Sequence, residues 1–371
     1  MKIICSKTSL LKSVNISLKA VPSKTTMPIL ECILIDASTN QIKFTTNDME
    51  LGIETIVDGT IAEKGMVALD AKIFYEIIRR LPDNDVTIHT DENYVATITC
   101  EKAKFTIPGK TGEDFAYLPV IERDESLTLS QFTLKEMIRQ TLFSIAVNEN
   151  NRLMTGELFE IKDNCLKIVS LDGHRISIRR MPLKREYSDK KIVVPGKTLS
   201  EISKILSGEV DDQVSIYFTK NHILFEFDQT MVVSRLIEGE YFRIDQMISS
   251  DYDTRLSVNK KEFLNCIDRA TLLVREGDKK PIVIDIRDNK MELKIDSSMG
   301  SMNEEIDIEK EGKDILIGFN PKFLIDALKV IDDENIHMYL MNPKAPCFIR
   351  DDEETYTYLI LPVNISQNQA R

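Results

Sequence analysis

Apolar and polar positions along the chain repeat one unit three times. The unit is a short apolar strand that runs directly into an amphipathic helix, and it occurs at residues 67–74, 192–199 and 317–324. Each copy begins 125 residues after the one before it, since 67 plus 125 is 192 and 192 plus 125 is 317. Stacked solenoid repeats have periods of roughly 20–50 residues. The longer interval therefore predicts three tandem domains of similar fold.

Other elements recur at nearly the same interval. Turn residues split two alternating apolar runs in each copy, the pattern of a β-hairpin, at Thr39-Asn40, Asp163-Asn164 and Asp288-Asn289. We expect an aspartate to close the second strand of each hairpin, at Asp48, Asp172 and Asp296. Before the hairpin in each copy, the apolar spacing predicts another helix, around residues 10–20, 133–146 and 260–273. An acidic turn after the second helix leads to a further strand at 86–88, 214–216 and 336–338.

Polar segments without periodicity, at 122–126 and 249–253, separate the copies. We therefore expect three domains, at 1–124, 125–251 and 252–371. Each domain is predicted to be α+β, with two helices packed on antiparallel sheets. The length of 371 residues and the 42% hydrophobic content allow a core in each domain.

Composition limits the location and the cofactors. The chain has no run of 18 apolar residues, and its N-terminus passes into a predicted strand without a signal peptide. We expect a cytoplasmic protein that does not bind membranes. No C-x-x-C pair or histidine cluster has metal-ligand spacing, so we expect no metal or cofactor and reduced, half-buried strand cysteines. These are Cys5, Cys32, Cys100, Cys165, Cys266 and Cys347.

Charge distribution gives the first indication of function. A formal net charge of −12 by itself argues against nucleic-acid binding. However, the second helices carry basic residues at two equivalent positions, Lys72, Lys197 and Lys322, and, seven residues later, Arg79, Lys204 and Lys329. Positions seven apart share a helix face. The first helices add further basic residues, including Lys135, Arg139, Lys260 and Arg269.

One such helix face would be interpreted as an ordinary solvated surface, because lysine is a good helix former. Lysine and arginine make up 48 of 371 residues, so chance would rarely place them at all six equivalent positions. The threefold pattern favours a surface that faces a polyanion. A ring with basic helices lining its hole and acidic strands outside would segregate charge in this way.

Four short runs resemble the bacterial sliding clamps, the β subunits of DNA polymerase III. They are Asp172-Gly173-His174-Arg175, Val194-Pro195-Gly196-Lys197-Thr198-Leu199, Ser234–Gly239 followed by Tyr241, and Tyr358–Val363. The resemblance covers residues 1–363 in order. It implies a head-to-tail homodimer that closes a ring around duplex DNA without reading its sequence, with helices inside and sheets outside. It also implies a non-enzymatic processivity factor that binds DNA polymerase subunits, the clamp loader and other proteins with clamp-binding peptides.

Matching positions in this resemblance suggest three sets of site residues. The DNA-binding set is Lys24, Lys72, Arg79, Asn148, Arg152, Leu153, Lys197, Lys204, Lys322 and Lys329. The partner-peptide pocket is Met154, Leu171, Gly173, His174, Arg175, Ile176, Met247, Asn320, Phe323, Pro346, Leu359, Ile360, Leu361, Pro362 and Val363. The alternative is that many of these are domain-core residues, and Leu171 and Ile360 fit a core equally well. The dimer interface is Phe105 and Ile107 on one side, with Leu272 and Leu273 opposite.

Two departures from the family pattern affect these expectations. The loop 148–153 lacks the aromatic residues that often touch DNA there, which puts base stacking in doubt. The polar tail from Asn364 to Arg371 extends beyond the usual end of the chain, and we expect it near the mouth of the pocket.

Two other functions fit parts of the sequence. Asp172, His174 and Arg175 could form an acid-base site, but such a site needs a nucleophile or metal and an orienting group. No G-x-S-x-G, P-loop, G-x-G-x-x-G or H-E-x-x-H pattern is present. Asp172 also has the equivalents Asp48 and Asp296 without an adjacent histidine, which favours a turn or strand-end hydrogen bond. The other alternative is a specialised paralogous clamp with different partners. A test of whether this chain can replace the resident clamp in cells would distinguish the paralogue from a replicative clamp.

Overall fold

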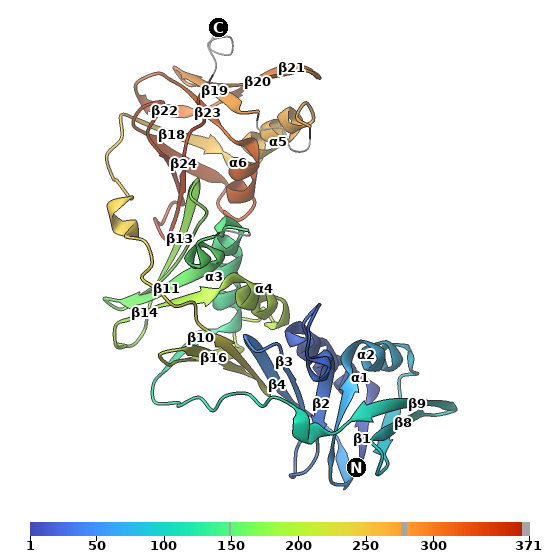
Figure 1. Ribbon diagram of the computed structural model, residues 1–371. Helices are drawn as coiled ribbons and strands as arrows, with labels where there is room; N and C mark the ends of the chain where they lie inside the picture. Colours follow the sequence, from blue (N-terminus) through green and yellow to red (C-terminus); the bar gives the residue numbers. More distant parts are fainter. Residues whose placement is uncertain (148–149, 276–279, 366–371) are drawn as a thin grey trace. The chain divides into compact units, whose positions relative to one another are not determined.

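The computed structural model describes residues 1–147, 150–275 and 280–365 (Figure 1). The chain divides into two compact units. Unit 1 contains Met1–Lys135 and Lys197–Leu236, and unit 2 contains Glu136–Gly196 and Ile237–Arg371. The second repeat therefore contributes to both units.

The strands of unit 1, within the described residues, form one 13-stranded sheet in the order β10-β15-β16-β17-β4-β3-β2-β6-β9-β8-β7-β1-β5. The pairings between its strands are antiparallel. The first-repeat strands are β1 (Lys2–Ser6), β2 (Cys32–Asp36), β3 (Ile42–Asn47), β4 (Leu51–Val57), β5 (Thr60–Glu63), β6 (Met66–Asp70), β7 (Asp85–Thr90), β8 (Val95–Cys100) and β9 (Ala103–Lys110). The second-repeat strands are β10 (Ser126–Ser130), β15 (Gln213–Phe218), β16 (His222–Phe227) and β17 (Thr230–Arg235).

Unit 2, where the structure describes it, has a 9-stranded sheet in the order β14-β11-β12-β13-β26-β25-β24-β18-β22 and a 4-stranded sheet in the order β21-β20-β19-β23. Its second-repeat strands are β11 (Gly156–Lys162), β12 (Cys165–Leu171), β13 (Arg175–Pro182) and β14 (Lys190–Pro195). Its third-repeat strands are β18 (Thr254–Asn259), β19 (Ile282–Arg287), β20 (Lys290–Ser297), β21 (Gly300–Asp307), β22 (Glu309–Gly312), β23 (Ile315–Phe319), β24 (Asn335–Leu340), β25 (Cys347–Arg350) and β26 (Tyr356–Ile360).

The helices confirm the predicted repeat. The first helices are α1 (Lys7–Ser17), α3 (Gln131–Thr141) and α5 (Lys260–Thr271), and the second helices are α2 (Ala71–Arg80), α4 (Gly196–Ile205) and α6 (Pro321–Leu328). Short 3₁₀ helices are η1 (Leu18–Ala20), η2 (Pro28–Glu31), η3 (Gly112–Asp114), η4 (Leu142–Ser144), η5 (Arg152–Thr155) and η6 (Ile244–Gln246). Asp70 and Asn320, at equivalent positions, cap α2 and α6 by accepting hydrogen bonds from the backbone N–H groups of Ile73 and Lys322.

The hairpin turns lie where the sequence predicts them, between β2 and β3, β11 and β12, and β19 and β20. Asp163 and Asn164 both have positive φ angles, 49° and 56°, as a two-residue type I′ turn requires. Asp48 and Asp172 directly follow the second strands of their hairpins. Asp296 departs from this prediction, because it lies inside β20 and pairs with Ser301.

Apolar side chains form separate cores in the two units. Phe44 and Phe74 belong to the core of unit 1, and Phe263 and Tyr358 to the largest core of unit 2. A smaller cluster in unit 2 contains Leu171, Ile176 and Leu359, where strands of the second and third repeats meet. The described residues include no helix with both the length and the apolar character to cross a bilayer.

The prediction for the cysteines is partly wrong. No disulfide joins them, but all except Cys165 are buried rather than half-buried, and Cys266 lies in helix α5. Cysteine behaves as a small hydrophobic residue when it packs in a core. Burial raises the pKa of Cys5 to about 12, so that thiol stays protonated.

Candidate DNA-facing and partner-binding sites

A tight turn joins β12 to β13 in unit 2. One carboxylate oxygen of Asp172, Oδ1, accepts hydrogen bonds from the backbone N–H groups of His174 (3.0 Å) and Arg175 (3.2 Å). Gly173, between them, has a φ of 85°, in the left-handed region that suits glycine. The predicted turn role of Asp172 is therefore confirmed.

Arg175 fastens this turn to the rest of unit 2. Its side chain is only 7% exposed, and its guanidinium donates to Asp172 Oδ2 (2.9 Å), Asp326 Oδ2 (2.7 Å) and the carbonyl of Phe143 (2.8 Å). The same group lies 4.4 Å from the ring centroid of Phe323. Burial by itself would lower the pKa of Arg175, but Tyr358 and the two carboxylates together raise it above its ordinary value. The arginine is thus a permanently charged anchor.

The acid-base alternative finds no support in this geometry. Both oxygens of Asp172 are engaged, Oδ1 by backbone N–H groups and Oδ2 by Arg175. The His174 ring instead stacks on Phe323, with ring centroids 6.1 Å apart. These contacts give both side chains structural roles at the turn.

A cavity of about 440 Å³ opens beside the turn; we call it the open groove. Its lining is mostly apolar, with methionines from two separate segments. The residues that line it are Met154, Leu171, Gly173, His174, Arg175, Ile176, Phe242, Met247, Pro346, Leu359 and Leu361. Flexible methionines and aliphatic side chains adapt to different apolar ligands, and the few polar groups can fix orientation. The groove suits a short peptide with apolar anchors.

Five residues predicted for the pocket lie outside this lining: Asn320, Phe323, Ile360, Pro362 and Val363. Ile360 is fully buried and pairs with Arg175 across β13 and β26. Phe323 supports His174 and Arg175, and Asn320 caps α6. The backbone N–H of Val363 donates to the carbonyl of Gly318 (2.8 Å), so the segment after β26 lies beside β23.

Phe242 lines the groove but was missing from the prediction. It lies 125 residues after Tyr117, and both are aromatic residues in the segments that connect the repeats. That repeat spacing is the signal that could have identified it.

Ile365 packs over Gly318, so the described part of the polar tail also lies at β23.

The basic residues predicted on the second helices are all exposed. Several have acidic partners within the same unit. Arg79 pairs with Glu76 (2.8 Å) and Lys204 with Glu201 (2.8 Å), while Lys197 pairs with Asp48. The acidic partner Glu76 raises the pKa of Arg79. Asp326 is the repeat equivalent of Glu76 and Glu201, but it binds Arg175 instead.

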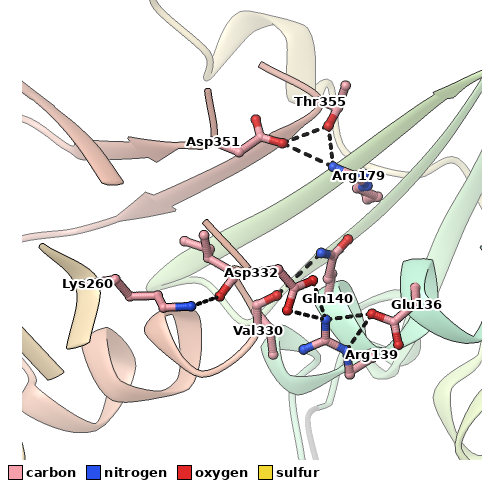
Figure 2. Close-up of polar contacts among 10 residues, drawn as sticks. Glu136, Arg139, Gln140, Arg179, Lys260, Val330, Asp332, Asp351 and Thr355 are labelled. Atoms are coloured by element: carbon pink, nitrogen blue, oxygen red, sulfur yellow. Dashed lines mark hydrogen bonds and ion pairs between the residues drawn. The ribbon is translucent and has the colours of Figure 1, made fainter. Parts of the chain in front are cut away.

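The first helices contribute less to a basic surface than predicted. Figure 2 shows Arg139 bound by Glu136 and Asp332, and Gln140 donating to the carbonyl of Val330. Lys260 donates to the carbonyl of Ile331 (2.6 Å), and Lys135 to that of Leu206 (3.1 Å). Such contacts satisfy carbonyl groups left free beyond a helix end. These cations therefore hold unit 1 or unit 2 together internally.

Figure 2 also shows Arg179 between Asp351 and Thr355, which joins β13 to the loop before β26. Together with the Arg139 and Gln140 contacts, it links the second and third repeats inside unit 2. The junction that forms the open groove is therefore held at several points.

The remaining predicted DNA contacts have mixed surroundings. Asn148 lies outside the described residues. Arg152, in η5, and Lys24 are exposed, whereas Leu153 is half-buried and packs against the cluster that contains Leu171. Leu153 therefore has a structural contact in addition to any contact with DNA.

The residues predicted for the dimer interface differ in exposure. Phe105 on β9 is 39% exposed, and Leu272, at the end of α5, is 74% exposed. Ile107 and Leu273 are half-buried against the cores of their own units. Of these four residues, Phe105 and Leu272 are therefore the two that are exposed enough to contact a partner.

The threefold repeat and the groove at a repeat junction are features of a ring-forming clamp, and comparison with known proteins identifies the family. Models for the N-terminal, central and C-terminal domains of the DNA polymerase III beta subunit match residues 1–119, 128–242 and 245–364. The chain therefore belongs to the DNA polymerase III beta subunit family, the sliding clamps. The three tandem matches confirm the predicted three-domain clamp fold.

Individual relatives agree. The chain is 35% identical to the "Beta sliding clamp" of Staphylococcus epidermidis, over 95% of this chain and 96% of that protein. A crystal structure described as a DNA polymerase III beta subunit from Eubacterium rectale is 69% identical, with a TM-score of 0.96, covering 98% of this chain and 100% of the other. The DNA polymerase sliding clamp of Bacillus subtilis is 34% identical, with a TM-score of 0.95 and coverage of 99% and 100%.

Proposed function

We propose that two copies of this chain join head to tail into a ring that encircles duplex DNA and tethers the replicative DNA polymerase. The observation that carries this proposal is the family match along nearly the whole chain, in three tandem repeats. The exposed basic residues at equivalent positions of α2, α4 and α6 support it. The repeats are taken as domains 1–124, 125–251 and 252–371 of a cytoplasmic protein without catalytic activity of its own.

Tethering explains how such a ring acts without chemistry. A polymerase bound to the ring meets the primer end as an intramolecular partner, at an effective concentration set by the tether. Retention on DNA comes from closure of the ring, so tight phosphate binding would only slow sliding. Phosphate contacts also carry no sequence information, which suits a protein that must pass over every sequence.

The internal ion pairs of the basic helices fit this requirement. Glu76 and Glu201 lie beside Arg79 and Lys204, and Asp48 lies beside Lys197. A carboxylate that competes with phosphate for the same cation weakens each DNA contact. The proposed DNA-binding set, Lys24, Lys72, Arg79, Asn148, Arg152, Leu153, Lys197, Lys204, Lys322 and Lys329, would therefore make many weak contacts that exchange rapidly.

The open groove is the proposed docking site for partner peptides. Polymerase subunits, the clamp loader and other replication or repair proteins would insert apolar side chains between the methionines and the aliphatic wall. The turn at Asp172, fixed by Arg175, would hold the mouth of the groove in one shape, so little entropy is lost on binding.

Neutralising the basic helices should flatten the salt dependence of DNA binding. The change is Lys72, Lys197 and Lys322 to glutamine, because a glutamate at 197 would face Asp48. Each lost phosphate contact lowers the log–log salt slope by about 0.9. Anisotropy titrations of a labelled duplex over a range of salt concentrations measure this slope. The control variant carries glutamine at the exposed Lys64, Lys102 and Lys184, which lie between strands. An equal slope in both variants would exclude the helical lysines as DNA contacts.

Truncation should separate the groove from the polar tail. Ile360 is a core residue, so the long truncation removes residues 361–371 and the short one removes 366–371. Loss of Leu361 removes part of the apolar wall of the groove. A buried leucine contributes about 1.5–3 kcal/mol to the binding free energy, so peptide affinity should fall roughly 10–100-fold. Anisotropy with a Gln-x-x-apolar-Phe peptide should show this loss only for the long truncation. Full-strength binding by that variant would refute the groove assignment, and weakened binding by the short one would place the tail in the site.

A further inference from the structure

The tight turn beside the open groove has a counterpart in unit 1, between β3 and β4. Asp48 Oδ1 accepts from the backbone N–H groups of Glu50 (3.0 Å) and Leu51 (2.7 Å), as Asp172 does from His174 and Arg175. Met49 has a φ of 75°, close to the 85° of Gly173. A left-handed methionine is uncommon, so the chain keeps this turn geometry even without glycine.

The strands beside the two turns also correspond. Arg235 N–H donates to the carbonyl of Glu50 (2.8 Å), and Leu361 N–H donates to that of His174 (2.9 Å). In the same register, Val233 pairs with Gly52, as Leu359 pairs with Ile176. Each turn thus lies where a strand of one repeat joins the last strand of the next.

A second cavity, of about 120 Å³, lies beside the turn of unit 1. Eight of its ten lining residues occupy positions equivalent to residues of the open groove. Asn47, Met49, Glu50, Gly52, Tyr117, His222, Val233 and Arg235 stand where the open groove has Leu171, Gly173, His174, Ile176, Phe242, Pro346, Leu359 and Leu361. Unit 1 therefore contains a copy of the groove with a little over a quarter of its volume.

Two of these differences draw the chain's own linker into the cavity. Asn47, in place of Leu171, donates from Nδ2 to the carbonyl of Ala116 (3.0 Å). Gly52, in place of Ile176, leaves room for Leu118, because a Cβ at position 52 would lie 2.1 Å from Leu118 Cδ2. The Asn47 side chain thus holds the linker backbone, and the space left by the absent side chain at position 52 accommodates Leu118.

We propose that this cavity is a closed copy of the partner groove, occupied by the linker segment 116–119 of the same chain with Leu118 as the resident apolar side chain. The linker acts as a built-in ligand, and each chain therefore offers partners a single groove although its repeat creates two. This interpretation of the open groove rests on the proposed function, whereas the seating of the linker does not.

Limited trypsin digestion of the full chain tests the seating. Substituting Leu118→Ser should release the linker and speed cleavage after the exposed Arg123 by about ten-fold or more, since cleavage follows the population of the open form. Cleavage after Arg185, in the loop between β13 and β14, should keep its wild-type rate and reports any global loosening. Wild-type cleavage after Arg123 in this variant would overturn the proposal, as would equal acceleration at both sites.

A reciprocal pair of substitutions gives an independent check. Gly52→Ala alone should expel Leu118 and accelerate cleavage after Arg123, whereas Gly52→Ala added to Leu118→Ala should accelerate it no further than Leu118→Ala alone does. Acceleration in the double variant equal to the sum of the single effects would contradict the fit between the two positions. Neither proteolysis assay uses peptide or DNA, so failure here leaves the proposed function standing.

Calorimetry of the wild-type chain with the Gln-x-x-apolar-Phe peptide should give one site per chain, and two sites would contradict the closed copy.

Discussion

Replacing Leu272 with aspartate is expected to yield a folded monomer in place of a dimer. Leu272 follows α5 with 74% of its surface exposed, so the substitution removes nothing from the core of unit 2. Burying a leucine at an interface stabilises it by about 1.5–3 kcal/mol, and an unpaired charge there costs more. A two-chain ring contains this contact twice. Sedimentation equilibrium at micromolar concentration should show the mass fall from twice 42.4 kDa to 42.4 kDa.

Leu273 provides the matched control, because it is the adjacent leucine but packs against the core of unit 2. Aspartate at 273 should lower the thermal unfolding midpoint, whereas aspartate at 272 should leave it unchanged. The interface predicted from the sequence included both leucines, but only Leu272 is well exposed. A dimer that survives Leu272→Asp would remove this residue from the interface.

Replacing Arg175 with methionine should destabilise unit 2 by about 3–5 kcal/mol. The change leaves Asp172 and Asp326 without their common partner, and removing one member of a buried ion pair costs energy of this order. It also deletes the hydrogen bond to Phe143 and the contact with the Phe323 ring. Urea unfolding followed by circular dichroism measures the loss, and peptide binding should fall with it because the turn forms the groove mouth.

Arg179→Met is the control for this prediction. Arg179 is also paired, with Asp351, but its side chain is more exposed than that of Arg175. Water partly replaces its partner, so a loss of only about 1 kcal/mol is expected. Equal effects of the two substitutions, or a loss under about 1 kcal/mol for Arg175→Met, would show that Arg175 is not the anchor of the turn.

Local chemistry explains why much of the fold could be predicted. The strand-to-helix units depend on apolar spacing and on caps such as Asp70 and Asn320, which act within a few residues. The turn at Asp163-Asn164 similarly needs only residues that tolerate positive φ. Because the unit occurs three times, an element predicted in one repeat can also be checked against the sequences of the other two.

The details of the sites depend on contacts that sequence spacing does not encode. Arg139 and Asp332 are 193 residues apart, and Lys197 and Asp48 are 149 apart. Nothing local shows that these cations are already paired. Ile360 was placed in the pocket by its matching position in the family, but every residue of β26 is buried. A strand covered on both faces has no alternation from which to assign a face.

Release from DNA on linearisation tests the ring most directly. Clamps loaded by a clamp loader onto a nicked circular plasmid are separated from free protein by gel filtration, and the plasmid is then cut once with a restriction enzyme. A closed ring that slides should co-elute with the circle and leave the DNA after the cut. Protein that remains bound to the linear product as it was to the circle would contradict the ring, because binding would then be by contact rather than by encirclement.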